Sequence, residues 1–321
     1  MIKKQMGKRG IFYTIAAIAL TIVLFVTYSN ISSYTFSEKM DVIQTRIETV
    51  NYFIKDVEKD LRKGIYIAGF RSILSLNQFV TTNGTYVDNV NLRLSEAFLN
   101  GTINNYSMSL MKDSTFNDWG NKIAAEAGKI DINFNFTVNK IMIGQTDPWS
   151  VEIGVNVSLD IKDKRNTSKW VRESYLVQKI SLIGFEDPLY VVNSQGRVTN
   201  TILISNITSF VINKDPGNLR MHMNRSYYIA HNDSPGFLMR LEGNLNPSDH
   251  GIESLVNLEK FQQQGLTLKA RSIVDYIYFG NQITVNHRIN KTPEWFKIDN
   301  EHLEKYEVTN ITCSPSECYT S

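Results

Sequence analysis

The 321-residue sequence predicts an α+β protein, in which one long N-terminal helix is followed by a largely antiparallel, β-rich extracellular body. Three observations predict this class. An uncharged apolar run covers residues 11–28, apolar residues at heptad spacing cover 36–61, and alternation of apolar and polar residues begins at residue 132. The first two patterns are typical of helices, and alternation with a period of two is typical of strands.

The apolar run at residues 11–28 has the length of a membrane span. Eighteen residues at a helical rise of roughly 1.5 Å give about 27 Å, close to the hydrocarbon thickness of a bilayer. Four basic residues precede the run, so the positive-inside tendency places residues 1–10 in the cytoplasm as a basic head and the rest outside. The run is long for a removed secretory signal, which favours an uncleaved span or one retained after cleavage on its cytoplasmic side.

Residues 29–80 are predicted to continue the span as an amphipathic stalk helix. Their apolar residues step by three and four, at Phe36, Met40, Ile43, Ile47, Val50, Ile54, Val57 and Leu61. No proline precedes Pro148, so nothing in the sequence requires this helix to break. Gly64 and Gly69 are the first residues that would weaken it. The apolar stripe either packs on the protein's own body or forms a seam for another helix.

A helical segment is predicted over residues 81–130. One helix is expected from Val90 to about Ile103, and a second around Trp119, ended by Gly128.

The body over residues 131–321 is predicted to be β-rich. Residues 132–138 and 151–161 alternate, and the stretch 170–183 returns after a polar turn at 163–169, which favours antiparallel pairing.

Later parts of the body mix strand and helix in this prediction. Strands are expected within residues 184–196 and 272–280, and Ile283 and Val285 are expected to return from the second after a Gly280-Asn281 turn. A short polar helix is expected around His302.

Twelve Asn-x-Ser/Thr sequons follow the apolar run, which indicates a glycosylated extracellular chain. Asn232 and Asn290 are each followed by proline directly after the sequon, which disfavours their use. The glycosylation candidates are Asn83, Asn100, Asn105, Asn135, Asn156, Asn166, Asn206, Asn224 and Asn310. A glycan at Asn156 would require the face opposite Val155 and Val157 to be open to solvent.

Cys313 and Cys318 are the only cysteines. Outside the cell such a close pair usually forms a local disulfide. The alternative is half of a metal site, which no second Cys or His pair completes to four ligands. We therefore predict a disulfide and no metal.

The sequence offers no catalytic motif. His-Glu-x-x-His, a Gly-x-Ser-x-Gly elbow, a Walker loop and a dinucleotide fingerprint are all missing, so we predict no catalytic residues and no cofactor. Five histidines are expected to be surface or hydrogen-bonded residues, at positions 222, 231, 250, 287 and 302. Glu186 and Asp187 are adjacent and would point to opposite faces of a strand, and Asp187-Pro188 is typical of turn initiation. Asp275 is the one buried-acid candidate, expected to bond a nearby backbone donor.

The charge of the chain is nearly balanced, with 34 basic and 32 acidic residues. No dense Lys/Arg cluster follows the span, so nucleic acid is not expected as a partner. The lipid bilayer is the expected partner.

The N-terminal plan resembles that of type IV pilin-like proteins. A basic head ends in Lys-Arg-Gly at residues 8–10, an apolar helix begins at once at Ile11, an amphipathic extension follows, and the body is β-rich. In that family a prepilin peptidase cuts after the glycine. The resemblance therefore implies processing between Gly10 and Ile11, with prepilin peptidase as a partner and other pilin-like subunits packing through residues 11–61.

The sequon density resembles archaeal members of this class, which carry class III signal peptides and N-glycans. Ile15 stands at the fifth mature position, where many pilins carry Glu, and this weakens the case for a major subunit. The body is similar to uncharacterised archaeal membrane-anchored proteins, which implies no activity.

The sequence thus predicts a non-enzymatic, single-pass extracellular glycoprotein of the cell membrane, with its N-terminus in the cytoplasm, that serves as a pilin-like component of a surface filament or secretion apparatus. The alternative is a signal-anchored surface protein that binds a ligand, a glycan or a neighbouring cell and does not assemble. An anchored hydrolase is disfavoured for want of a site, and signal transduction because ten cytoplasmic residues cannot hold an output domain.

Overall fold

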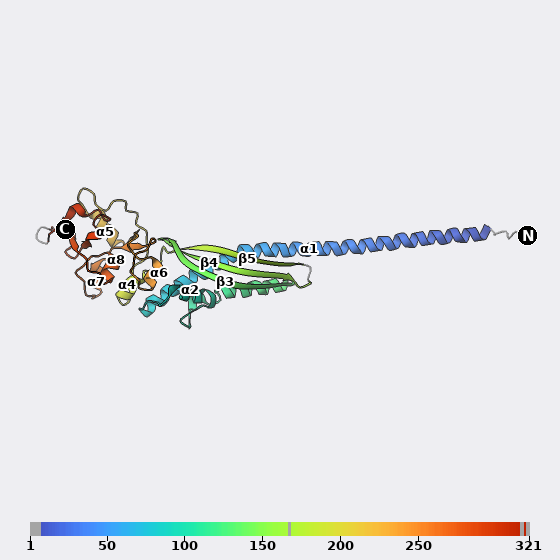
Figure 1. The fold of residues 1–321 in the computed structure, drawn as a ribbon, viewed down its shortest axis with the longest axis horizontal. Coiled ribbons are helices and arrows are strands. Elements are labelled where there is room, and N and C mark those ends of the chain that lie inside the picture. The colour runs from blue at the N-terminus through green and yellow to red at the C-terminus, as the bar shows by residue number, and fades with distance from the viewer. Residues whose placement is uncertain (1–7, 166–167, 315–317, 319–321) are drawn as a thin grey trace, which may run out of the picture.

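The computed structural model describes the backbone of residues 8–165, 168–314 and 318, and their side chains except at residues 8–11 and 30–39. The molecule is elongated, with helix α1 (Lys8–Asn83) projecting from one end and the C-terminal region lying at the other (Figure 1). A helix of 76 residues is about 114 Å long at a rise of about 1.5 Å per residue. The predicted α+β class is confirmed, and so is the unbroken helix from the apolar run into the body.

Helix α1 continues through Gly64 and Gly69, the two glycines at which the sequence could weaken it. Each glycine instead allows a neighbouring side chain to come close to the helix. A Cβ atom at Gly64 would lie 2.8 Å from Cδ1 of Trp119, and one at Gly69 would lie 2.7 Å from Cδ1 of Ile153. These glycines bring the helix close to its neighbours and do not interrupt it.

The apolar stripe of α1 divides into two parts. Val50, Val57 and Leu61 are buried against the body, whereas Met40 and Ile47 are 51% and 40% exposed. The second part packs on the protein's own body, which is one of the two interpretations of the stripe. The first part is exposed at Met40 and Ile47.

Two further helices pack beside α1. Helix α2 (Val90–Asn100) begins at the side-chain cap Asn89 and ends because Gly101 adopts a left-handed φ of 71°. The hairpin of β1 (Thr102–Ile103) and β2 (Tyr106–Ser107) and the short 3-10 helix η1 (Ser109–Met111) lead to α3 (Phe116–Lys129). A reciprocal Thr115–Asp118 capping box starts α3. The predicted helical segment is confirmed, although α2 ends before Ile103.

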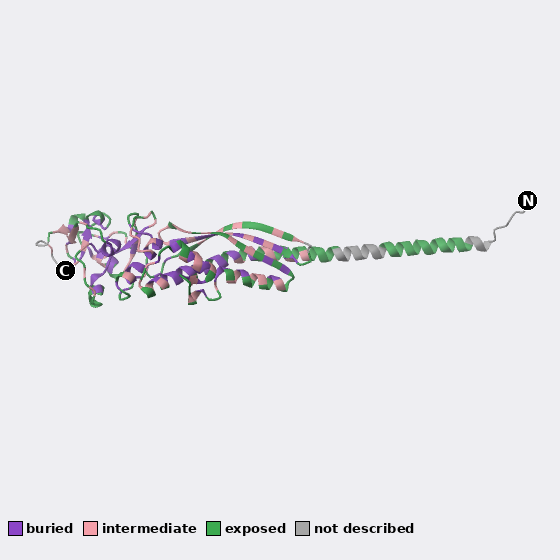
Figure 2. Cartoon of the chain, turned by 60° about the horizontal axis from the view of Figure 1, so that its bottom comes forward, coloured by how far each residue is buried: buried purple, intermediate pink, exposed green. Residues whose placement is uncertain are grey.

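A three-stranded antiparallel sheet covers one side of α1, in the order β3 (Ile132–Asp147), β4 (Ser150–Asp163) and β5 (Lys169–Ser181). One face of the central strand is completely buried, at Val151, Ile153, Val155, Val157, Leu159 and Ile161. These residues form the first core with α1, α2 and α3, seen as the buried interior beside the helix in Figure 2. The predicted antiparallel hairpin is confirmed.

The C-terminal region, residues 184–313, consists of short elements around a second core. Its helices are α4 (Pro188–Asn193), α5 (Gly217–Asn224), α6 (Phe237–Leu241), α7 (Leu258–Gln263), α8 (Asp275–Phe279), η2 (Asn300–His302) and η3 (Thr309–Ile311). Its strands are β6 (Tyr228–Ala230), β7 (Ile252–Ser254), β8 (Asn286–Ile289), β9 (Lys297–Asp299) and β10 (Thr312–Cys313). They form one antiparallel pair, β6–β7, and one three-stranded sheet, β10–β8–β9. Long strands in the body are therefore confined to residues 132–181.

Three predictions for this region are wrong. Residues 188–193 form helix α4, because Asp187 caps the backbone N–H of Leu189 and Pro188 occupies the first turn. The run at 272–280 contains helix α8, whose five residues are all buried; packing on all sides overrides their strand propensity. Ile283 is fully exposed and lies outside any strand. The short helix expected near His302 is present as η2.

Candidate functional site

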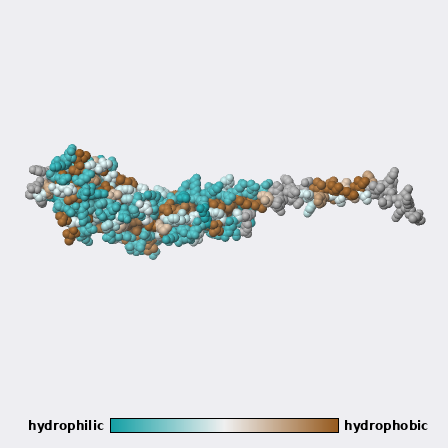
Figure 3. Space-filling model, turned by 45° about the horizontal axis from the view of Figure 1, so that its top comes forward, coloured by the Kyte–Doolittle hydropathy of each residue, from teal (hydrophilic) through white to brown (hydrophobic). Residues whose placement is uncertain are grey.

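The first half of α1 is an uncovered apolar surface. Its window Phe12–Ser29 has a mean hydropathy of 1.9 over 18 residues, and none of them is buried against the described part of the chain. Figure 3 shows this apolar surface on the projecting helix, in contrast to the largely hydrophilic body. The helix is long and apolar enough to cross a membrane.

Exposed apolar residues occur on α1 over more than a single membrane thickness. Met40, Ile43 and Ile47 are exposed nearer the body. Residues 12–47 measure about 54 Å along a helix at about 1.5 Å per residue, compared with about 30 Å of bilayer hydrocarbon. A bilayer that covers the first part therefore leaves the apolar residues near the body in contact with water, unless another chain covers them.

The predicted processing position lies at the start of α1, with Gly10 and Ile11 in its first turns. The side chain of Ile11 is outside the described set. Most glycosylation candidates are exposed, namely Asn83, Asn100, Asn105, Asn135, Asn206, Asn224 and Asn310. Asn156 is half-buried and donates to Oε1 of Glu173 at 2.7 Å, so it is poorly placed for a glycan. Asn166 lies outside the described residues.

The two cysteines form a disulfide, with Cα atoms 5.3 Å apart. Cys313 belongs to β10, whose partner strand is β8. The bond therefore closes a small loop at the end of the second core.

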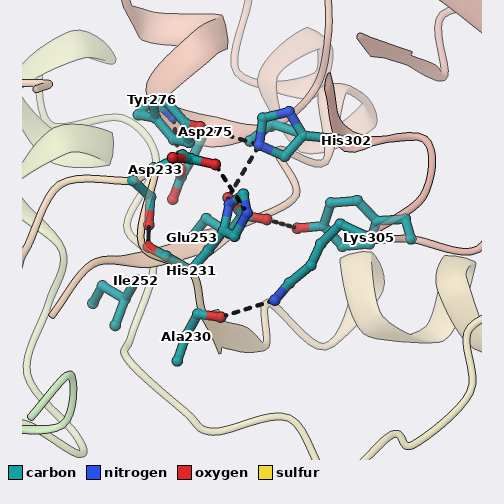
Figure 4. A network of polar contacts seen from close by, with 12 residues as sticks. Ala230, His231, Asp233, Ile252, Glu253, Asp275, Tyr276, His302 and Lys305 are labelled. Carbon is teal, nitrogen blue, oxygen red and sulfur yellow. Dashed lines mark hydrogen bonds and ion pairs between the residues drawn. The ribbon is translucent and has the colours of Figure 1, made fainter. Parts of the chain in front are cut away.

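A buried polar cluster lies in the C-terminal region, where His231, Glu253 and His302 converge (Figure 4). Ile229 of β6 pairs with Glu253 of β7, so His231, two residues further on, lies on the same side of the strand pair as Glu253. His302 comes from η2. One oxygen of Glu253, Oε2, lies 2.8 Å from Nδ1 of His231 and 3.3 Å from Nε2 of His302.

Other polar groups surround this cluster. The hydroxyl of Tyr306 donates to Oε1 of Glu253 at 2.9 Å, and Asp299 Oδ1 lies 2.6 Å from Nδ1 of His302. Burial alone would raise the pKa of Glu253, but its hydrogen bonds to His231 and His302 outweigh this effect and lower the pKa to about 2. Burial alone would lower the pKa of His302, but Asp299 and Glu253 raise it to about 10. The cluster therefore holds opposite charges close together in a dry environment.

A second buried network joins the two cores. Arg240 of α6 is completely buried, and its Nη1 lies 2.6 Å from Oδ2 of Asp187 and 2.9 Å from Oδ2 of Asp275. The Ser254 hydroxyl donates to the same oxygen of Asp275 at 2.8 Å, and the Tyr228 hydroxyl donates to Oδ2 of Asp187 at 2.9 Å. Burial raises the pKa of Asp275, against the lowering effect of Arg240. The network ties α4, α6 and α8 together.

Asp275 has the buried position that the sequence suggested. It accepts from its neighbour's backbone N–H, at Tyr276, as expected. Its ion-pair partner, Arg240, was not predicted from the sequence. Asp187 caps α4 and binds Arg240, so its role is structural.

The histidine cluster escaped sequence reasoning, which predicted no metal ligands. His231 and Glu253 are 22 positions apart, and His302 comes from a different element near the C-terminus. No local spacing links them. In β7, Glu253 stands between Ile252 and Ser254, and this local pattern gives no signal of its unusual position.

The chain matches no protein-family model, and no curated protein or solved structure is significantly similar to it.

Proposed function

We propose that this protein is a non-enzymatic, membrane-anchored extracellular subunit of pilin-like type, in which α1 first anchors the chain in a bilayer and then packs against other copies in a surface filament or secretion apparatus. The observation that carries the proposal is that α1 is one unbroken helix with two exposed apolar stretches, Phe12–Ser29 and, nearer the body, Met40, Ile43 and Ile47.

The two exposed apolar stretches of α1 suit two different kinds of contact. Lipid suits the uniformly apolar part, Phe12–Ser29. Met40, Ile43 and Ile47 share one face at spacings of three and four, which is the pattern of a helix–helix seam. A second copy of the same helix supplies an apolar surface of matching length. The exposed sequon asparagines fit an extracellular body in the same arrangement.

The proposed processing is tested by mass spectrometry of the mature N-terminus, in the wild type and in a Gly10→Val variant. We expect a wild-type chain that starts at Ile11, and an unprocessed variant. An intact Met1 in the wild type would contradict the pilin-like assignment, and a start near Asn30 would contradict anchoring altogether.

The proposed packing is tested by cysteine crosslinking of the full chain in its native membrane. Ile43→Cys places a thiol on the uncovered apolar face, and Thr45→Cys places one on an exposed position on the other side of the helix. We expect oxidation to give dimers with Ile43→Cys and several-fold fewer with Thr45→Cys. Equal yields, or none from either variant, would contradict packing through this face.

The alternative function, a signal-anchored binding protein, has one observation in its favour. A groove of about 640 Å³ lies between the end of α1 and the β1–β2 hairpin, with Phe79, Asn83 and Tyr106 in its lining. Asn83 and Asn105, which precedes Tyr106, are both sequon asparagines, so glycans there would cover the groove. An intact N-terminus together with an absence of crosslinks would favour this alternative.

A further inference from the structure

We infer that His231, Glu253 and His302 form a binding site for one divalent transition-metal ion, of which Zn²⁺ is the best fit. Each residue offers one ligand atom, and the three atoms lie within 4.8 Å of one another. Two imidazoles and one carboxylate make a donor set typical of zinc bound by three protein ligands, with a fourth position left for water.

The distances between ligand atoms agree with a metal at their centre. Bonds of about 2.0–2.1 Å in a tetrahedron place the ligand atoms about 3.3 Å apart. Oε2 of Glu253 is 3.3 Å from Nε2 of His302 and 2.8 Å from Nδ1 of His231. The hydroxyl of Tyr276 lies 3.1 Å from the same nitrogen of His302 and would give up this contact when the ion binds. Small side-chain shifts would admit the ion.

The outer nitrogen of each imidazole also faces a carboxylate. Nδ1 of His302 is 2.6 Å from Asp299, and Nε2 of His231 is 3.5 Å from Oδ2 of Asp233. Such a carboxylate accepts the outer N–H, orients the ring and directs the other nitrogen's lone pair toward a metal. Asp299 is itself held by the hydroxyl of Ser272 at 2.6 Å. His302 therefore has the outer support that metal-ligating histidines commonly have, and Asp233 lies close enough to give the same support to His231 after a small shift.

The hydrogen-bond inventory also favours a metal. A neutral imidazole has one N–H, yet each ring here faces a carboxylate from both of its nitrogens. The centroids of the two rings are 5.2 Å apart, so two protonated rings would place like charges close together. A divalent ion beside Glu253 lets both rings stay neutral and donate outward.

An ion at this position would link segments that are far apart in the sequence. It would connect the β6–β7 pair to the η2 segment, in a region where the helices and strands are short. The His231 side chain is 17% exposed, so the ion can reach the site from solvent. A bound metal that holds the native state stabilises it by mass action.

The test uses the full chain in detergent micelles, stripped with EDTA and then titrated with ZnSO₄ in a calorimeter. We expect one Zn²⁺ per chain and a higher melting temperature once it is bound. His231→Gln and His302→Gln should weaken binding at least 10-fold, whereas the matched controls His250→Gln and His287→Gln should bind like the wild type. Co²⁺ in place of Zn²⁺ should give the visible absorption of a four-coordinate site in the wild type, lost in His231→Gln.

Asp233→Asn is a second variant that keeps the test decisive if the histidine variants fail to fold. The Asp233 side chain is 76% exposed, and the substitution leaves His231, Glu253 and His302 unchanged. Loss of an outer carboxylate typically weakens metal binding by about 10- to 100-fold, so we expect a change near the lower end. Absence of Zn²⁺ binding in the wild type would overturn the inference. Wild-type affinity in the folded His231→Gln and Asp233→Asn variants, or equal loss in the His250→Gln control, would also overturn it.

Discussion

The two regions of the body are held together by different interactions. In the region around the sheet, long elements bury apolar faces against α1, and Asp163 is the only buried charged side chain among the described residues up to 181. In residues 184–313 the elements are short, and the buried acidic, basic and histidine side chains are Asp187, His222, Arg240, Glu253, Asp275, Asp299 and His302. Both regions bury an apolar core, and the second adds particular polar contacts between distant residues.

The largest expected effect is the loss of the arginine that joins the two cores. Arg240→Met leaves Asp187 and Asp275 buried without their cation, so we expect a loss of about 3–5 kcal/mol in the free energy of unfolding. The same change at Arg172, in the sheet region, breaks an exposed pair with Glu58 and should cost at most about 1 kcal/mol. Denaturant titration of the full chain in detergent measures both. Similar losses in the two variants would remove the contrast between the regions.

A pH-dependent effect should be confined to the C-terminal region. Burial lowers the pKa of His222 to about 4, against a weaker raising effect of Glu253. Above pH 6.5 this residue is neutral in both folded and unfolded chains and adds no pH dependence. Below pH 6.5 the unfolded chain gains a proton that the folded chain does not, so stability should fall by up to about 3 kcal/mol between pH 6.5 and pH 4.

In the metal-free chain, kept in EDTA, His302 and Glu253 add no slope between pH 6.5 and pH 5. The stabilising effect of the raised His302 pKa is complete below pH 6.5, and that of the lowered Glu253 pKa is lost only as the pH falls from about 4.5 to 2. Unfolding measured from pH 6.5 to pH 5 should therefore lose most of its slope in His222→Phe and keep it in His250→Gln. An unchanged slope in His222→Phe would assign the pH dependence to other groups.

The smallest effect tests close packing in the sheet region. A Cβ at Gly120 of α3 would overlap the ring of Phe136, whereas a Cβ at Gly128 of the same helix meets nothing within 4 Å. We expect Gly120→Ala to destabilise by about 1–3 kcal/mol, since steric overlap outweighs the gain in helix propensity. Gly128→Ala should be neutral or stabilise by up to about 1 kcal/mol. Thermal unfolding compares the two, and equal shifts would show that α3 is not closely packed on the sheet.

The sequence by itself determined the elements whose pattern is local and long. The apolar run, the stripe of α1, helices α2 and α3 and the alternation of β4 all follow from periodicity, because each buries a face defined by residues close in the chain. Only the tertiary structure decided which part of the stripe is covered. Val57 and Met40 belong to the same stripe of apolar residues, but Val57 packs against the body and Met40 is exposed.

The polar contacts of the C-terminal region were likewise decided only in three dimensions. Asp187, Arg240 and Asp275 come from three different helices or their caps, and His231, Glu253 and His302 come from three separate segments. No spacing along the chain predicts these contacts, because the residues are brought together only when the separate segments pack against one another. The sequence therefore indicated a long helix, apolar at its start, that carries an α+β body, and the structure alone revealed the buried charges that hold the far end of that body together.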